Sequence, residues 1–66
     1  MTAGERITKL RLERNLTQKQ LAEKIGCSEK RIRNWETDKT KPNISAVIAL
    51  IDFFGVTADY LVGRKD

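Results

Sequence analysis

The spacing of apolar and polar residues predicts an all-α protein. Apolar side chains recur three and four positions apart in several separate stretches, which is the period of a helix that buries one face. No stretch alternates apolar and polar residues cleanly enough for a half-buried strand. The 66 residues contain no repeat, low-complexity tract or linker, so a single domain over residues 1–66 is expected.

Capping residues divide the first part of this pattern into three short helices. The first is expected over roughly 3–14. Its inner face carries Ile7, Leu10, Arg11 and Arg14. The second starts at Thr17, which has Gln20 at the spacing of a capping box, and ends at Gly26. Ser28 is the expected cap of the third.

Two further helices are expected after the polar stretch TDKTKPN. Pro42 and Asn43 announce the fourth helix, and Gly55 ends it. Thr57 can cap a fifth helix that runs through about Val62. The fourth helix is predicted to have a broad apolar face made of Ile44, Val47, Ile48, Leu50, Ile51 and Phe54.

Gly26 stands between two short helical patterns. Ala22 and Ile25 precede it and Ile32 follows it. Glycine adopts the left-handed backbone at little cost and disfavours a helix interior. Two helices joined by about three residues that include glycine form a helix-turn-helix, whose second helix can lie in the major groove of DNA. The spacing predicts this unit over about 17–37, although a generic helical hairpin has the same spacing.

The charge is unevenly distributed along the chain. The net charge is +4, and residues 1–41 hold eleven Lys and Arg against six Asp and Glu, whereas residues 42–66 hold two against three. A basic half beside a nearly neutral apolar half favours a polyanionic partner on one side and a core or protein partner on the other. An ordinary solvated surface has the same net charge.

Several classes of function are disfavoured by the composition. The chain has no His and a single cysteine, Cys27, so neither a metal site, a cofactor nor an enzymatic centre is expected, nor is a disulfide. No apolar run approaches the ~20 residues of a membrane span, and a secretory signal is not evident, so a cytoplasmic location is expected. A chain this small is expected to have little room for a ligand pocket of ~300–1,000 Å³.

The stretch LTQKQLAEKIGCSEKRIRNWETDKTKPNISAVIALIDFFGVTADYLVG resembles the DNA-binding domain of the lambda/434 repressor and Cro-like helix-turn-helix family. Residues that carry the resemblance include Thr17, Gln18, Ala22, Gly26, Ile32, Trp35, Glu36, Lys39 and Pro42, together with FGVTADYL. It implies a compact five-helix fold and a transcriptional repressor or activator, with a repressor favoured, that binds specific double-stranded DNA. Asn15 and Asp38 stand where such proteins often carry glycine, and both residue types tolerate the left-handed backbone.

The third helix carries the residues expected to read bases. Its outer face and N-terminus present Ser28, Glu29, Lys30, Arg33 and Asn34. Lys30 and Arg33 suit guanine, Asn34 suits adenine, and Glu29 can accept from cytosine. The residues expected to hold phosphates are Gln18, Thr37, Lys39, Thr40 and Lys41.

Two further expectations concern pairing of charges and of chains. Arg11 lies on the apolar face of the first helix, and Glu36 lies about 40° from Ile32 on the third, so the two charges are expected to form a buried ion pair. In the alternative, Arg11 only extends past the core to solvent.

The protein is also expected to form a weak homodimer on a palindromic operator, and this dimer need not exist before DNA is bound. The residues expected at its interface are Phe53, Ala58, Leu61 and Val62. In the alternative, Phe53 packs on its own chain.

A different class of function remains open. The same fold can serve as a protein-interaction module or an antitoxin-like regulator whose main partner is a protein. Such a module need not keep positive charge on the outer face of the third helix. Lys30 and Arg33 on that face therefore favour DNA.

Overall fold

The computed structural model describes residues 1–63, and these residues form five α-helices and no strand. The helices are α1 (Ala3–Glu13), α2 (Gln18–Ile25), α3 (Glu29–Glu36), α4 (Ile44–Phe54) and α5 (Ala58–Val62). The all-α five-helix prediction is confirmed. The order and bounds of the helices agree with the sequence expectation to within a residue or two.

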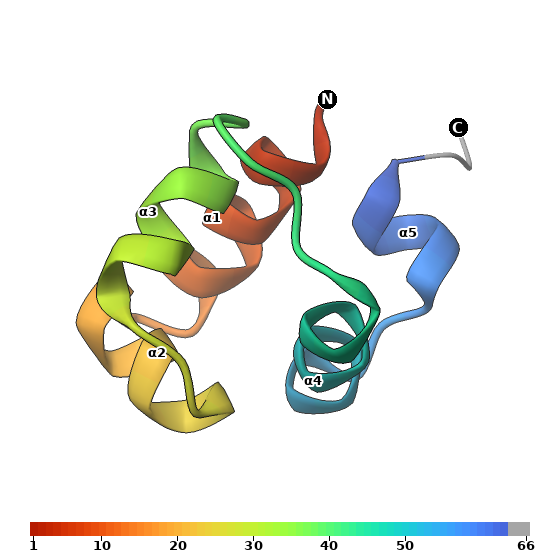
Figure 1. The fold of residues 1–66 in the computed structure, drawn as a ribbon. Helices are drawn as coiled ribbons and strands as arrows, with labels where there is room; N and C mark the ends of the chain where they lie inside the picture. The colour runs from red at the N-terminus through yellow and green to blue at the C-terminus, as the bar shows by residue number, and fades with distance from the viewer. Residues whose placement is uncertain (64–66) are drawn as a thin grey trace.

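The helices form two groups joined by the loop 37–43 (Figure 1). In the first group α3 contacts both α1 and α2, which places the helix-turn-helix against the first helix. In the second group α4 contacts α5. The groups meet where α1 contacts α5 and α2 contacts α4, so one core lies between them.

Every helix begins at a residue whose side chain accepts a hydrogen bond from the first turn. These residues are Thr2, Thr17, Ser28, Asn43 and Thr57. The predicted capping box of Thr17 and Gln20 is present, and Thr2 and Glu5 form another. Each cap contributes roughly 0.5–2 kcal/mol, a large share of the stability of such short helices.

The turns require left-handed backbone at the residues that the sequence singled out. Gly26 ends α2 with φ 76°, which redirects the chain into α3. Asn15 has φ 57° and Asp38 has φ 61°, so both non-glycine residues take the conformation that glycine often supplies. The short polar side chains of Asn and Asp make this conformation accessible.

The core is narrower on α4 than the apolar pattern predicts. The buried residues are Ile7, Leu10, Leu21, Ala22, Ile32, Trp35, Leu50, Phe54 and Leu61. The prediction that Ile44 and Ile48 belong to this face is wrong, because they are 76% and 51% exposed. Ile44 is the first residue of α4, and Ile48 lies about 100° around the helix from the half-buried Val47.

Gly4 allows α1 to approach the end of α3 closely. A Cβ at this position would lie 2.4 Å from the Trp35 carbonyl oxygen and 2.6 Å from that of Glu36. The Asp38 carboxylate accepts from the Thr2 hydroxyl at 2.6 Å and from the Gly4 amide at 3.1 Å. Asp38 therefore fixes the end of α3 to the N-terminus of α1, where a negative charge is favoured.

Candidate nucleic-acid interface

The recognition surface is the outer face of α3, defined by Ser28, Glu29, Lys30, Arg33 and Asn34. The opposite face of this helix is held in the core by Ile32 and Trp35, which are 0% and 5% exposed. Of the recognition surface, only Asn34 is half-buried, and the other four residues are exposed. Because one face is locked, the other has a fixed orientation, which base recognition requires.

The cations of the recognition surface form no ion pair within residues 1–63. The one ion pair among residues 1–63 joins Arg11 to Glu36, so Lys30 and Arg33 have no carboxylate partner among those residues. At the start of the helix, the Ser28 hydroxyl accepts from the Arg31 amide at 3.2 Å and still has its own proton to donate. The surface thus offers positive charge and hydrogen-bond donors.

The predicted ion pair fixes the far end of α3. Arg11 donates from Nε to Glu36 Oε2 at 2.7 Å and from Nη2 to Oε1 at 3.1 Å, and the two side chains are 13% and 5% exposed. Arg11 Nη1 also donates to the Leu16 carbonyl at 2.8 Å. A bidentate guanidinium–carboxylate pair has directional strength that a single contact lacks. It therefore sets the angle between α1 and α3.

Gln18 takes part in the same network. Its side-chain Nε2 donates to Glu36 Oε1 at 3.0 Å. An amide nitrogen has two protons, so one is still available for a DNA phosphate. The sequence predicts Gln18 only as a phosphate contact. It does not reveal the contact with Glu36, because that contact depends on how α2 packs against α3.

The Thr37 side chain closes the end of α3, and its contact with a DNA phosphate stays a prediction. Its hydroxyl donates to the Arg33 carbonyl at 3.0 Å and to that of Asn34 at 3.3 Å. A hydroxyl has only one proton, so to donate to a phosphate the Thr37 hydroxyl would have to turn away from these carbonyls. Ser and Thr hydroxyls commonly bond back to a carbonyl one turn earlier in a helix, which explains this orientation.

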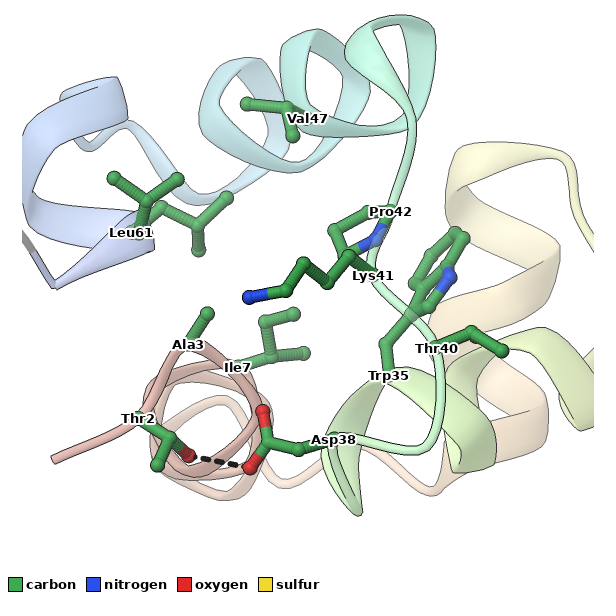
Figure 2. A pocket seen from close by; sticks show the side chains of 11 residues that line it. Thr2, Ala3, Ile7, Trp35, Asp38, Thr40, Lys41, Pro42, Val47 and Leu61 are labelled. Atoms are coloured by element: carbon green, nitrogen blue, oxygen red, sulfur yellow. Dashed lines mark hydrogen bonds between the residues drawn. The ribbon is translucent and has the colours of Figure 1, made fainter.

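The remaining phosphate candidates lie in the loop that follows α3. Lys39, Thr40 and Lys41 are all exposed. The Asn34 carbonyl accepts from the Lys39 amide at 2.9 Å and from the Thr40 amide at 3.3 Å, so the start of the loop is fixed to α3. The Lys41 side chain lies over a cleft between the loop and α5, with its ammonium group directed into the cleft (Figure 2).

The predicted dimer patch is only partly exposed. Ala58 is exposed and Val62 is 39% exposed, but Leu61 is 1% exposed and belongs to the core. Assigning Leu61 to the patch is therefore wrong, because α5 turns this residue toward α1 and α4. Phe53 is half-buried and packs edge-to-face on Phe54, with ring centroids 5.1 Å apart.

Arg14 holds the end of α4 next to that patch. Its guanidinium donates to the carbonyls of Phe53 and Phe54 at 3.2 and 2.9 Å and lies 5.3 Å from the centroid of the Phe53 ring. The periodicity predicts Arg14 on the inner face of α1. In the structure the residue is instead exposed and its guanidinium lies at the end of α4. A cation at the C-terminus of a helix is favoured by the helix dipole.

Other chemistry is limited in the part of the chain that the structure describes. Residues 1–63 contain no cluster of His, Cys, Asp or Glu that could hold a metal ion. No helix among them is long and apolar enough to cross a membrane. Burial raises the pKa of the Cys27 thiol above 9.0, and nearby Arg31 offsets part of this shift.

A family comparison identifies this arrangement. Residues 7–61, from the middle of α1 to Leu61 in α5, match the family model described as helix-turn-helix. The chain belongs to the helix-turn-helix family. The family resemblance inferred from the sequence is thereby confirmed, and the turn at Gly26 is the one for which the family is named.

Individual relatives of this helix-turn-helix protein are regulators. It is 38% identical over 66 residues to the HTH-type transcriptional activator BcrR of Enterococcus faecalis, covering 100% of this chain and 32% of that protein. It is 38% identical over 65 residues to the immunity repressor protein of Bacillus phage phi105, covering 98% of this chain and 45% of that protein. The chain thus spans less than half the length of either relative.

A solved structure has the same fold. The P22 c2 repressor protein, crystallised in complex with a synthetic operator, superimposes with a TM-score of 0.90 at 32% sequence identity. The match covers 94% of each chain. The five-helix arrangement around the recognition surface is therefore that of lambda/434-like repressor domains.

Proposed function

We propose that this helix-turn-helix protein is a sequence-specific transcriptional regulator, a repressor, that reads the major groove of double-stranded DNA with α3. The observation that carries the proposal is the exposed cationic outer face of a helix whose inner face is locked by Ile32 and Trp35. The likeness to a repressor solved on its operator supports the same mode of binding. The location that goes with this role is the cytoplasm, and no catalytic role or cofactor is part of it.

Base reading is assigned to the recognition surface. Lys30 and Arg33 would donate to guanine O6 and N7, and Asn34 would form paired hydrogen bonds with adenine. Ser28 and Glu29, at the first turn, would lie near base edges, where Glu29 can accept from cytosine N4. The residues that would bind phosphates and fix the register of α3 are Gln18, Thr37, Lys39, Thr40 and Lys41.

We infer twofold binding to a palindromic operator through the patch that remains after Leu61 is removed from it. Ala58 and Val62 present the exposed apolar area on α5, and the half-buried Phe53 at the end of α4 would add to it. This area is small against the ~800 Å² per partner of a standard interface, so the dimer would form on DNA.

Selection from a pool of random duplex DNA tests the proposal. Repeated rounds should enrich one palindromic sequence, which would demonstrate DNA binding and twofold symmetry together. The matched control is the Arg33→Ala variant, which should enrich a degenerate sequence or none. If the unaltered protein enriches nothing at moderate salt, the main partner is a protein.

A further inference from the structure

A cleft of about 520 Å³ lies between the loop 37–43 and the helices α1, α4 and α5. Its volume falls within the ~300–1,000 Å³ of small-molecule sites, so the expectation of little room for a pocket is wrong. Ile7 and Leu61 form its floor, and Val47 and the Trp35 indole contribute to its walls (Figure 2). Val62 also lines the cleft. The interior is therefore largely apolar.

One charged group is directed into this apolar space. The Lys41 side chain comes from the loop, and its ammonium group points toward the cleft between Ile7 and Leu61 (Figure 2). Lys41 forms no ion pair within the described residues 1–63. Asp38 also borders the cleft, but its oxygens accept from the Thr2 hydroxyl and the Gly4 amide. A cation that makes no ion pair within residues 1–63 and stands beside an apolar cavity favours an anion there, although the Asp38 carboxylate on the same rim keeps its negative charge.

We propose that this cleft binds a small organic carboxylate with an apolar tail. The tail occupies the space above Ile7 and Leu61, and the carboxylate pairs with the Lys41 ammonium. Neither part suffices alone, because the apolar walls offer an inorganic anion nothing and a neutral tail leaves Lys41 unpaired. The site is thus specific for the combination of charge and tail.

The cleft is linked to the DNA contacts through Lys41, a step that rests on the proposed function. The same ammonium group cannot hold a phosphate of DNA while it pairs with a ligand on the other side of the loop. A bound carboxylate therefore removes one phosphate contact and lowers the affinity for all DNA sequences alike. The ligand acts as an inducer for a regulator of this kind.

Trp35 provides a direct measurement, because it is the only tryptophan in the chain and lines the cleft. Octanoate, as the probe, should change the Trp35 fluorescence saturably, whereas acetate and octanol should bind much more weakly. Lys41→Met keeps an unbranched apolar side chain without the charge and should weaken octanoate binding by about tenfold or more. Lys39→Met removes the same charge from the same loop outside the cleft lining and should leave octanoate binding unchanged.

The competition with DNA is measured separately. Saturating octanoate should weaken DNA binding by the unaltered protein and have no effect on the Lys41→Met variant. The proposal is overturned if octanoate gives no saturable signal, if Lys41→Met binds it equally well, or if acetate or octanol binds as tightly. If the protein binds no DNA, the proposed function fails while the fluorescence titration still decides whether the cleft is a site.

Discussion

The guanidinium of Arg11 and the carboxylate of Glu36 meet between α1 and α3 in a bidentate pair, with Nε 2.7 Å from Oε2. Arg11→Ala should lower the free energy of unfolding by ~3–5 kcal/mol, because Glu36 is then left charged in a site where it is only 5% exposed. A domain of this size has little stability to lose, so the melting temperature should fall by tens of degrees. Thermal unfolding by circular dichroism measures this change.

Lys9→Ala is the matched control for that pair. Lys9 lies on the same helix and is exposed, so its loss should change the stability by no more than ~0.5 kcal/mol. Equal melting temperatures for Arg11→Ala and Lys9→Ala would contradict a structural role for the pair.

The second prediction concerns the close approach of α1 to α3. Gly4→Ala should destabilise the fold by ~1–3 kcal/mol, because the new Cβ meets the backbone carbonyls of Trp35 and Glu36, which cannot turn aside as a flexible side chain can. Gly26→Asn is the contrasting variant. Its Cβ enters open space and asparagine tolerates the left-handed backbone, so the cost should be smaller. Urea unfolding of both variants gives the comparison, and an equal or reversed order would count against the packing of α1.

The third prediction tests twofold binding. Ala58→Glu places a charge on the exposed patch of α5, where the start of the helix accepts an acidic residue without loss of monomer stability. Affinity for a full palindrome should fall while affinity for an isolated half-site stays the same. Titration of the two duplexes by fluorescence anisotropy separates these effects. Equal affinity of the unaltered protein for half-site and palindrome would rule out the proposed dimer.

The fourth prediction concerns the Cys27 thiol. Burial raises its pKa above 9.0, so at any pH below that value a smaller fraction is thiolate than in an unburied cysteine. Alkylation by iodoacetamide should therefore be slower in the folded protein than in the same protein unfolded in urea, and the rate should rise with pH. A faster reaction in the folded state would show that Arg31 outweighs burial.

Local chemistry explains which parts of the fold could be predicted. The left-handed residues Gly26, Asn15 and Asp38 follow from what each residue type allows at a turn. Arg11 and Glu36 could be paired because each charge interrupts an apolar stripe. The turns need only the sequence near each residue, whereas the ion pair also requires that the apolar faces of two helices meet.

Features that depend on how the helices pack against one another could not be predicted from the sequence. The apolar period of α4 includes Ile44 and Ile48, yet the stripe is wider than the neighbouring helices can cover. Helix α5 has only five residues, so its sequence covers too few turns to show which face is buried. This explains the error at Leu61. The cleft beside Lys41 and the contact of Asp38 with α1 join segments far apart in the chain.

The last prediction separates reading of bases from binding of phosphates. Lys39→Ala should weaken all DNA sequences alike and lower the slope of log affinity against log salt by ~0.9, the value for one lost phosphate contact. Arg33→Ala should instead lose ~1–3 kcal/mol on the selected operator and relax discrimination at one base pair.

The ratio of operator affinity to random-duplex affinity, measured at one salt concentration for the unaltered protein and for Arg33→Ala, tests the central claim most directly. Base reading by α3 predicts that this ratio falls by roughly tenfold or more in Arg33→Ala, with non-specific binding reduced less. An unchanged ratio in Arg33→Ala would contradict major-groove reading by the outer face of α3.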